Sequence, residues 1–331
     1  MRACQVLRFG DAARLRDVAL PVPGPGELAL DPAACALNFG DLLLIEGTYQ
    51  ERPEPPFTLG MEVAGTVAAL GPGVDGPAVG SRAVAYCGTG GLAGRVVLPA
   101  AACLPLPRSV GFETGAAIPV AYGTSEMALF HRARLRRGET LVVTGAAGGV
   151  GLTAVELGAE AGARVIACAR GEAKLRAARE AGAAAGIDTG AADLDLRAAI
   201  LAEGGADVLY DTVGGAGFEA ALRALRPGGR AIVVGFAGGE VGRVRLNHLL
   251  VKNVDVIGFY WGAYARFAPE AMRGSLARCV DLVAAGTLRP HVGATLPLAR
   301  VAEGFEMLRA RRSTGKVVIR IGPEDRQAAS A

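Results

Sequence analysis

The sequence predicts an α/β protein with two domains, one built on a doubly wound parallel sheet and one rich in short β-strands. From Glu139 onward, short apolar runs alternate with segments of helical periodicity, a pattern typical of parallel strands joined by crossover helices. Residues 1–118 contain short β-type runs that Pro-Gly turns such as "GPGVDGPAVG" interrupt. The length of 331 residues is too great for one small core and fits two domains.

Six strands are expected in the parallel sheet, in the order "ETLVVTG", "ARVIACAR", "AAGIDT", "ADVLYDTVGG", "RAIVVGFAGG" and "VDVIGFYWG". Helices are expected between them, at residues 150–161, 171–182, 193–202 and 216–226, with a short helical stretch near 247–251. Gly182 stands where a helix C-cap favours glycine, and Pro227-Gly-Gly is expected to stop the helix at 216–226. The first, second, fourth and fifth strands are apolar on both faces, which indicates a sheet covered on both sides.

The β-rich domain is predicted from "ELALDPAAC", "EVAGTVAAL" and "SRAVAYC", which favour short strands in a compact, barrel-like arrangement. The end of the chain adds a helix at 269–285 and a last strand, "KVVIRI". No internal repeat is evident, and only the tail "PEDRQAASA" is expected to be disordered.

Composition and charge exclude several classes of protein. The chain has 35 basic and 32 acidic residues and a formal net charge of +3, and this near balance does not indicate nucleic-acid binding. No stretch is apolar for long enough to cross a bilayer, and "MRACQVLRFG" is too polar for a signal peptide. A soluble, cytoplasmic protein is therefore expected. The basic run at 131–137 is interpreted as the solvated end of a helix, since helix C-termini favour cations.

The six cysteines and three histidines are scattered along the chain. The cysteines stand at 4, 35, 87, 103, 168 and 279, with no C-x-x-C pair, and the histidines at 131, 248 and 291, with no H-x-x-x-H pair. A metal site would have to be assembled from unrelated segments, so none is predicted. The cysteines are expected to serve as small buried apolar residues.

The segment "VVTGAAGGVG", residues 142–151, lies between the first strand of the parallel sheet and its helix. It follows the dinucleotide pattern G-x-G-x-x-G, with Ala146 in place of the first glycine. A pyrophosphate binds to N–H groups at a helix N-terminus, and glycine lets the backbone approach it closely. The predicted cofactor contacts are Ala147, Gly148, Gly149 and Val150, while Gly151 allows the helix to pack against the strand. The alternative is a glycine-rich turn that only packs.

The end of the second strand indicates which nucleotide binds. An NAD site places Asp or Glu there for the ribose 2′-hydroxyl, but this chain reads Ala167-Cys-Ala-Arg170 and has no carboxylate before Glu172. Arg170 and Lys174 are cations that suit a 2′-phosphate, so NADPH is the predicted cofactor. The alternative is that both are ordinary cations on a helix surface.

Six segments, in chain order "ALNFGDLLLIEGTY", "LGMEVAGTV", "AYGTSEMAL", "GAAGGVG", "KNVDVIGFYWGAY" and "TGKVV", carry a family resemblance. Together they resemble the zinc-independent quinone oxidoreductases of the medium-chain dehydrogenase/reductase superfamily. The resemblance implies a Rossmann dinucleotide-binding domain at 119–262 and an irregular, GroES-like β-barrel catalytic domain made of 1–118 and 263–331. It also implies a homodimer, often formed by joining the two nucleotide-binding sheets through strands near 254–261.

The same resemblance implies a protein that works without zinc. Zinc-dependent members carry a C-x-x-C-[GH]-T-D pattern and a G-H-E pattern, whose second cysteine and histidine bind the metal. This chain reads Cys35-Ala-Leu-Asn38 and Gly60-Met61-Glu62, so asparagine and methionine stand at the two ligand positions. The four-cysteine structural zinc lobe is also missing. Cys35 is interpreted as a packing residue, since catalytic zinc needs about three protein ligands.

Two residues match family positions in the catalytic domain. Asn38 is expected to donate a hydrogen bond to the substrate oxygen or to the nicotinamide ribose. Tyr49 is expected to line the cleft and to donate a proton to a developing enolate. The alternative for Tyr49 is an aromatic residue on the barrel surface.

Five more residues match positions around the cofactor and the substrate. Thr124 is expected beside the nicotinamide. Gly235 and Phe236 follow the fifth strand, at the end where open α/β sheets bind their ligands. Tyr260 and Trp261 are expected to wall either the substrate pocket or the dimer contact.

The expected reaction is metal-free hydride transfer from NADPH to a small-molecule quinone or conjugated enone, because a carbonyl is not strongly polarised without a Lewis acid. Two alternatives remain, an enoyl-thioester reductase and an NADPH-binding protein with little turnover, since fold alone does not settle function. The chain departs from related reductases at Ile187-Asp188-Thr189, where a tyrosine often packs near the adenosine phosphate. A carboxylate there would weaken a 2′-phosphate site if it pointed inward.

Overall fold

The computed structural model describes residues 1–327, which fall into two compact units. Among the described residues, the β-rich unit contains Met1–Val120 and residues 276–327, and the parallel-sheet unit contains Ala121–Ser275. The chain therefore returns to the β-rich unit later than the predicted boundary at 262/263.

Residues 263–275 belong to the parallel-sheet unit, and side chains of this segment pack on it. The ring centroid of Tyr264 lies 5.8 Å from that of His131, with the two rings edge to face. Ser275 Oγ donates a hydrogen bond to Glu126 Oε2 at 2.5 Å, and both side chains are buried. Because these contacts join residues far apart in sequence, local patterns could not place this boundary.

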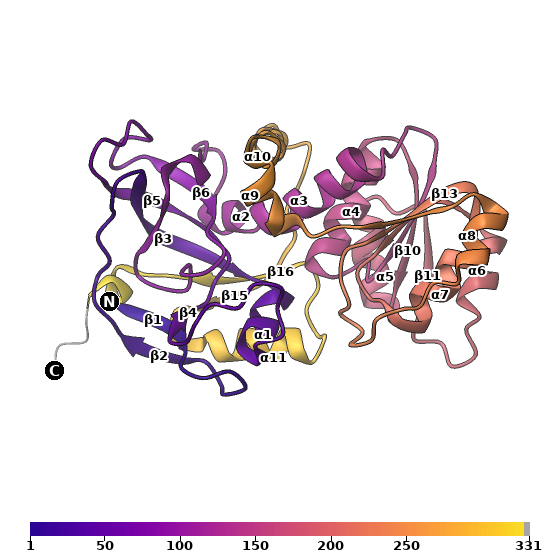
Figure 1. Cartoon of the computed structure of the whole chain (residues 1–331), viewed down its shortest axis with the longest axis horizontal. Helices are drawn as coiled ribbons and strands as arrows, with labels where there is room; N and C mark the ends of the chain where they lie inside the picture. Colours follow the sequence, from indigo (N-terminus) through magenta and orange to yellow (C-terminus); the bar gives the residue numbers. More distant parts are fainter. Residues whose placement is uncertain (328–331) are drawn as a thin grey trace. The chain divides into compact units, whose positions relative to one another are not determined.

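The parallel-sheet unit holds six parallel strands in the order β11-β10-β9-β12-β13-β14. Figure 1 labels β10, β11 and β13 of this sheet and the helices α4 to α8 of the same unit. Their bounds are β9 Thr140–Thr144, β10 Arg164–Ala169, β11 Ala185–Asp188, β12 Ala206–Asp211, β13 Leu225–Val233 and β14 Asp255–Gly258. The central strands β9, β10 and β12 are almost entirely buried, as expected for strands that are apolar on both faces. The predicted fold class, a doubly wound parallel sheet beside a β-rich domain, is confirmed.

The helices that join these strands are α4 Gly149–Glu160, α5 Glu172–Glu180, α6 Leu196–Ala202, α7 Gly215–Arg223 and α8 Leu246–Lys252. One prediction about them is wrong, since Pro227-Gly-Gly does not stop α7, which ends at Arg223. The three residues lie inside β13, where the pairing with β12 changes register between Ala206 and Val208. The extra residues of β13 bulge out at this irregularity, which tolerates proline and glycine.

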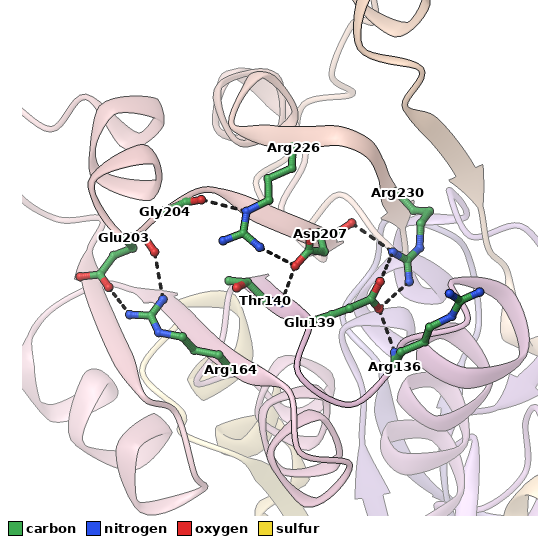
Figure 2. A network of polar contacts seen from close by, with 9 residues as sticks. All are labelled: Arg136, Glu139, Thr140, Arg164, Glu203, Gly204, Asp207, Arg226 and Arg230. Atoms are coloured by element: carbon green, nitrogen blue, oxygen red, sulfur yellow. Dashed lines mark hydrogen bonds and ion pairs between the residues drawn. The ribbon is translucent and has the colours of Figure 1, made fainter.

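Polar side chains join the strands at the edge of the sheet where β9, β10 and β12 begin (Figure 2). Arg230 donates from both terminal nitrogens to the carboxylate of Glu139, at 2.8 Å each. Asp207 Oδ2 accepts from Arg226 Nη1 at 2.7 Å and from the backbone N–H of Thr140 at 2.8 Å. The glycine segment lies at the other end of β9, so these contacts stabilise the sheet without touching the predicted cofactor site.

The β-rich unit contains a seven-stranded sheet and a three-stranded sheet. The larger sheet has the order β15-β16-β3-β5-β6-β8 with β7 paired to β3, and the smaller has the order β2-β1-β4. The bounds are β1 Arg2–Val6, β2 Arg14–Asp17, β3 Glu27–Leu37, β4 Phe57–Thr58, β5 Glu62–Leu70, β6 Arg82–Tyr86, β7 Val96–Pro99, β8 Cys103–Pro105, β15 Val292–Pro297 and β16 Lys316–Arg320. Strand β16 pairs antiparallel with β3, which brings the end of the chain beside residues 34–37. This pairing positions the buried polar residues of the β-rich unit that are described below.

Helices complete the described structure. They are α1 Phe39–Glu46, α2 Phe112–Ala116, α3 Pro119–Glu126, its π-helical continuation η2 Met127–Arg132, α9 Tyr264–Phe267, α10 Pro269–Ala284 and α11 Val301–Arg309, with short 3₁₀ turns η1 Ala100–Ala102, η3 Trp261–Ala263, η4 Leu298–Arg300 and η5 Pro323–Arg326. Helix η2 ends within the basic run at 131–137. Among the described residues, no helix is long and apolar enough to span a membrane.

The predicted disorder of the tail is wrong for its first part. Residues 323–326 form η5, and Asp325 is buried there. Asp325 accepts hydrogen bonds from the backbone N–H of Gly322 at 3.0 Å and from Arg2 Nη1 at 3.3 Å. This contact between the two ends of the chain orders the turn despite its polar composition. Residues 328–331 of the predicted tail lie outside the described residues.

Candidate functional site

The glycine segment forms a tight turn between β9 and α4. Gly145 has a φ of +62°, and Gly148 is the N-cap of α4. A Cβ atom on Gly151 would lie 2.2 Å from the carbonyl oxygen of Gly145, so only glycine permits this approach of helix and turn. A Cβ atom on Gly148 would meet nothing closer than 3.4 Å, and Gly148 is exposed. The turn therefore presents an open helix N-terminus, which fits a pyrophosphate.

The predicted contacts next to Gly148 differ in exposure. Gly149 and Val150 are partly exposed in the first turn of α4. Ala147 is buried and forms a small apolar cluster with Ala169 and Leu175. This cluster holds the glycine turn against the end of β10 and the side of α5.

A buried polar group that the sequence analysis missed supports the same turn from β12. Thr144 Oγ1 donates to Asp211 Oδ1 at 2.5 Å, and Thr212 Oγ1 donates to the carbonyl oxygen of Thr144 at 2.9 Å. The second oxygen of Asp211 accepts the N–H of Gly214 at 2.8 Å. Burial raises the pKa of Asp211, and these hydrogen bonds oppose that rise. The signal in the sequence was the polar "DTVGG" that directly follows an apolar strand.

Gly235 and Phe236 follow β13 at the same edge of the sheet. The N–H of Gly235 donates to the carbonyl oxygen of Asp211 at 3.4 Å, and Phe236 is 39% exposed. A Cβ atom on Gly214 would lie 2.8 Å from the ring of Phe236. The turns after β12 and β13 therefore meet at the carboxyl edge of the sheet, where ligands of open α/β sheets bind.

Helix α3 is fastened to the first turn of α4 by a second buried polar group. Ser125 Oγ lies 2.9 Å from the carbonyl oxygen of Val150 and 3.0 Å from the hydroxyl of Tyr210. Thr153 Oγ1 donates to the carbonyl oxygen of Ala121 at 3.0 Å. The predicted contact Thr124 is buried on the same helix. Serine and threonine in an apolar helix were the signal that sequence reasoning did not use.

The two cations predicted to bind a 2′-phosphate, Arg170 and Lys174, lie just after β10 and near the start of α5. Arg170 is exposed directly after β10, and Lys174 is partly buried in the first turns of α5. Glu172 is paired with Arg179 through two hydrogen bonds of 2.7 and 3.1 Å. Asp188 is exposed and accepts two backbone N–H groups, so its carboxylate does not point into the interior of the unit.

Asn38 is the N-cap of α1 in the β-rich unit, and its side chain is buried. Its Nδ2 donates to Glu62 Oε1 at 2.9 Å and to the carbonyl oxygen of Ala36 at 3.3 Å. Its Oδ1 accepts from Lys316 Nζ at 2.6 Å. Both N–H groups of the amide are thus engaged within the protein. The predicted role of Asn38 as a hydrogen-bond donor to substrate is at odds with this arrangement.

Lys316 and Glu62 form a buried ion pair beside Asn38. The Nζ–Oε1 distance is 2.7 Å, and the side chains are 5% and 0% exposed. Lys316 Nζ also donates to the carbonyl oxygen of Leu37 at 2.9 Å, and Glu62 Oε2 accepts the N–H of Val120 at 2.7 Å. All three hydrogens of the ammonium therefore have acceptors. Sequence reasoning missed this pair, although Glu62 and Lys316 are charged residues that stand directly before the apolar runs of β5 and β16.

Asp41 and Tyr49 lie around the same helix start. Asp41 accepts the N–H of Asn38 at 2.8 Å and that of Gly60 at 3.2 Å, and burial raises the pKa of its carboxyl to about 6. A Cβ atom on Gly40 would lie 2.7 Å from Met61 Cε and 3.1 Å from a ring carbon of Tyr49. The side chains of Tyr49 and Met61 therefore cover Gly40, two residues after Asn38.

The cysteines do not assemble a metal site in the described residues. Cys35 is buried, and burial raises the pKa of its thiol well above the ordinary value. Within residues 1–327, no group of three or more His, Cys, Asp or Glu side chains is placed to hold a metal ion.

Tyr260 and Trp261 follow β14 in the parallel-sheet unit. Trp261 is 4% exposed and opens the turn η3, while Tyr260 is partly buried. The ring of Phe259 lies 5.7 Å from that of Tyr264, so this segment is part of an aromatic cluster. Whether Tyr260 and Trp261 line a substrate pocket stays a prediction.

Comparison with known proteins identifies the two halves. The family described as "Alcohol dehydrogenase GroES-like domain" matches residues 24–108, and the family described as "Zinc-binding dehydrogenase" matches residues 149–278. A quinone oxidoreductase-like protein 2 homolog of Nematostella vectensis is 39% identical over 89% of this chain and 82% of its own length.

Solved structures agree over nearly the whole chain. A mycobacterial protein solved in complex with NADPH superposes with a TM-score of 0.90 at 30% identity, covering 97% of this chain and 99% of its own. The quinone oxidoreductase of Thermus thermophilus, also solved with NADPH, gives a TM-score of 0.85 at 33% identity and covers 97% of this chain and 100% of its own. The chain belongs to the quinone oxidoreductase family of the medium-chain dehydrogenase/reductase superfamily, and it is an oxidoreductase of that superfamily.

Proposed function

We propose that this protein reduces quinones or conjugated enones by metal-free hydride transfer from NADPH. The observation that carries the proposal is the open N-terminus of α4 at Gly148, one strand away from the exposed cation Arg170. A dinucleotide with a 2′-phosphate has one anionic group for each of these places. Two structural neighbours that match the chain closely are NADPH complexes.

The cofactor is held by the residues of the parallel-sheet unit. Backbone N–H groups of Gly148 and Gly149 receive the pyrophosphate, and Arg170 with Lys174 receives the 2′-phosphate. Thr124 and Phe236 flank the nicotinamide. When bound, the nicotinamide supplies the hydride, and the protein orients it.

The β-rich unit supplies the groups that act on the substrate. The phenol of Tyr49 provides a proton to the oxygen of the reduced substrate. Asn38 does not donate directly but fixes the start of α1, because its amide is held by Lys316 and Glu62. Packing against Gly40, in the first turn of α1, keeps Tyr49 in place.

A metal ion does not suit the surroundings of Asn38. Lys316 Nζ lies 2.6 Å from Asn38 Oδ1, and this buried ammonium would repel a divalent cation beside it. Zinc sites in proteins are built from Cys, His, Asp and Glu ligands, and Met61 is none of these. Hydride transfer to an electron-poor acceptor needs no Lewis acid at this place.

The test is NADPH oxidation by chelator-treated protein with a simple quinone and a simple enone. We expect turnover that zinc does not increase, NADPH preferred over NADH, and a KM for NADPH raised about tenfold by Arg170→Ala, since charge-assisted hydrogen bonds to the phosphate are lost. Activity that chelation abolishes and zinc restores would contradict the proposal. Turnover of enoyl thioesters alone would favour the longer substrate class.

A further inference from the structure

Asp188 joins two turns beside the proposed 2′-phosphate site. Its Oδ1 accepts the N–H of Gly171 at 2.8 Å and the N–H of Gly190 at 2.8 Å. Gly171 is the N-cap of α5 with a φ of +79°, and Gly190 lies in the turn after β11. These two N–H groups lower the pKa of Asp188, so the side chain is a carboxylate at neutral pH.

The carboxylate of Asp188 lies close to Arg170. A Cβ atom on Gly190 would be 2.8 Å from Arg170 Cγ and 3.1 Å from Asp188 Oδ1, so the arginine stem and the carboxylate oxygen border the same glycine. The charge of Arg170 also lowers the pKa of Asp188. Both side chains are exposed, so a phosphate that reaches Arg170 also meets this negative charge.

The place of this pair relative to the glycine turn is fixed within the unit. Ala169, directly before Arg170, packs with Ala147 of the glycine turn and Leu175 of α5. Strand β11 pairs with β10 in parallel register, Ala169 opposite Asp188. A nucleotide anchored at Gly148 therefore finds Arg170 and Asp188 together at the neighbouring strand ends.

We propose that Asp188 determines how strongly this site prefers NADPH over NADH. Through Oδ1 it holds the two turns in the shape that presents Arg170, and through its charge it opposes the 2′-phosphate. The site therefore prefers NADPH over NADH less strongly than it would if residue 188 held the same two turns without a negative charge. This inference rests on the proposed cofactor, NADPH, and names a residue that sets the preference for NADPH over NADH.

The substitution Asp188→Asn separates the two roles. An asparagine oxygen can accept both N–H groups, while the negative charge is removed. The probes are adenosine 2′,5′-bisphosphate and adenosine 5′-monophosphate, whose affinities are measured by calorimetry at low ionic strength. We expect Asp188→Asn to bind the bisphosphate about three to ten times more tightly and the monophosphate almost unchanged, with the gain shrinking as salt is added.

Two further variants control this result. Glu180→Gln removes an equal charge from the exposed end of α5 and should leave the ratio of the two affinities unchanged. Asp188→Ala removes the acceptor as well as the charge, and it should bind the bisphosphate less tightly than Asp188→Asn does. An affinity ratio in Asp188→Asn equal to that of the unsubstituted protein would overturn the inference.

Failure of the underlying cofactor proposal gives a different result. If Arg170→Ala binds the bisphosphate as tightly as the unsubstituted protein does, the 2′-phosphate does not bind at Arg170 and the NADPH proposal loses its support. If instead Arg170→Ala weakens the binding of the bisphosphate while Asp188→Asn leaves the ratio of the two affinities unchanged, the cofactor site stands and only the role of Asp188 is overturned.

Discussion

At the scale of single residues, Asn38, Glu62 and Lys316 are polar side chains in a core of apolar strands. Each finds its partners within the group or on the backbone, including the carbonyl oxygen of Leu37 and the N–H of Val120. A buried ion pair is weak evidence for stability, since desolvation offsets much of the attraction. Its effect is to fix geometry, because no member can move without leaving another unpaired.

The first prediction concerns the substitution Lys316→Met. It leaves the Glu62 carboxylate buried without its cation, which should lower the free energy of unfolding by about 3–5 kcal/mol. Urea unfolding at pH 7 measures the change. The double variant Lys316→Met with Glu62→Gln should recover much of the loss, because it no longer buries an unpaired charge.

Arg320 offers a matched control on the same strand. Its side chain is 66% exposed and pairs with Glu113, so Arg320→Met should change the free energy of unfolding by less than about 1 kcal/mol. If Lys316→Met were no more destabilising than this surface variant, the ion pair would not hold the start of α1 as we infer.

At the scale of elements, the parallel sheet is stabilised differently at its two edges. The carboxyl edge carries the glycine turn and the buried Asp211, while the opposite edge carries the ion pairs of Figure 2. Arg230 reaches across from β13 to Glu139, the residue before β9. Its hydrogen bonds lower the pKa of Glu139, so the native state favours the ionised carboxylate.

The second prediction is that Glu139→Gln destabilises the protein in a pH-dependent way. Because the pKa of Glu139 is lowered in the folded state, its contribution is complete above the ordinary glutamate pKa of about 4.3 and is lost as the pH falls through the folded value. We expect a loss of about 1–2 kcal/mol at pH 7 that shrinks in acid. Thermal unfolding at pH 7 and pH 4 measures both values.

Glu203 in the same network provides the comparison. Its pair with Arg164 is more exposed, at 37% and 42%, against 22% and 16% for Glu139 and Arg230. Glu203→Gln should therefore cost less than Glu139→Gln at pH 7. Equal losses of stability at the two positions would show that solvent screening does not make the Glu203–Arg164 pair weaker than the Glu139–Arg230 pair.

The elements and the glycine turn could be predicted from the sequence because their signals are local. Strand, glycine turn and helix follow one another within residues 140–160. The polar group at Lys316 could not be predicted in this way, since its hydrogen bond to Asn38 spans 278 residues and depends on the pairing of β16 with β3. The same limit explains the boundary at 275/276, which is set by contacts between distant segments.

At the scale of the whole molecule, β14 is an edge strand of the parallel sheet. Among the described residues it pairs only with β13. Helix α8, which leads into this strand, exposes Leu246 and Leu250 at 77% each. At the end of β14 the outward carbonyl oxygen of Gly258 accepts from Arg132 Nη2 at 3.3 Å. The rest of an edge strand is a template for another strand, and exposed apolar side chains beside it favour association. We propose that two copies of the chain pair through β14 and join their sheets.

Alternation along β14 identifies the residue that tests this pairing. The N–H of Phe259 donates to Val233 in β13, so the N–H of Ile257 also faces β13 and that of Val256 faces the free edge. Val256→Pro removes the outward N–H and leaves the hydrogen bonds to β13 intact, and an edge strand tolerates proline at such a position.

Light scattering should give twice the 33.6 kDa of one chain for the unsubstituted protein and the mass of a single chain for Val256→Pro. Far-UV circular dichroism and binding of adenosine 2′,5′-bisphosphate should be retained, because the cofactor turn lies on β9 at the centre of the sheet. A dimer that survives Val256→Pro would place the contact elsewhere, and an unsubstituted protein that is monomeric at micromolar concentration would remove the proposal.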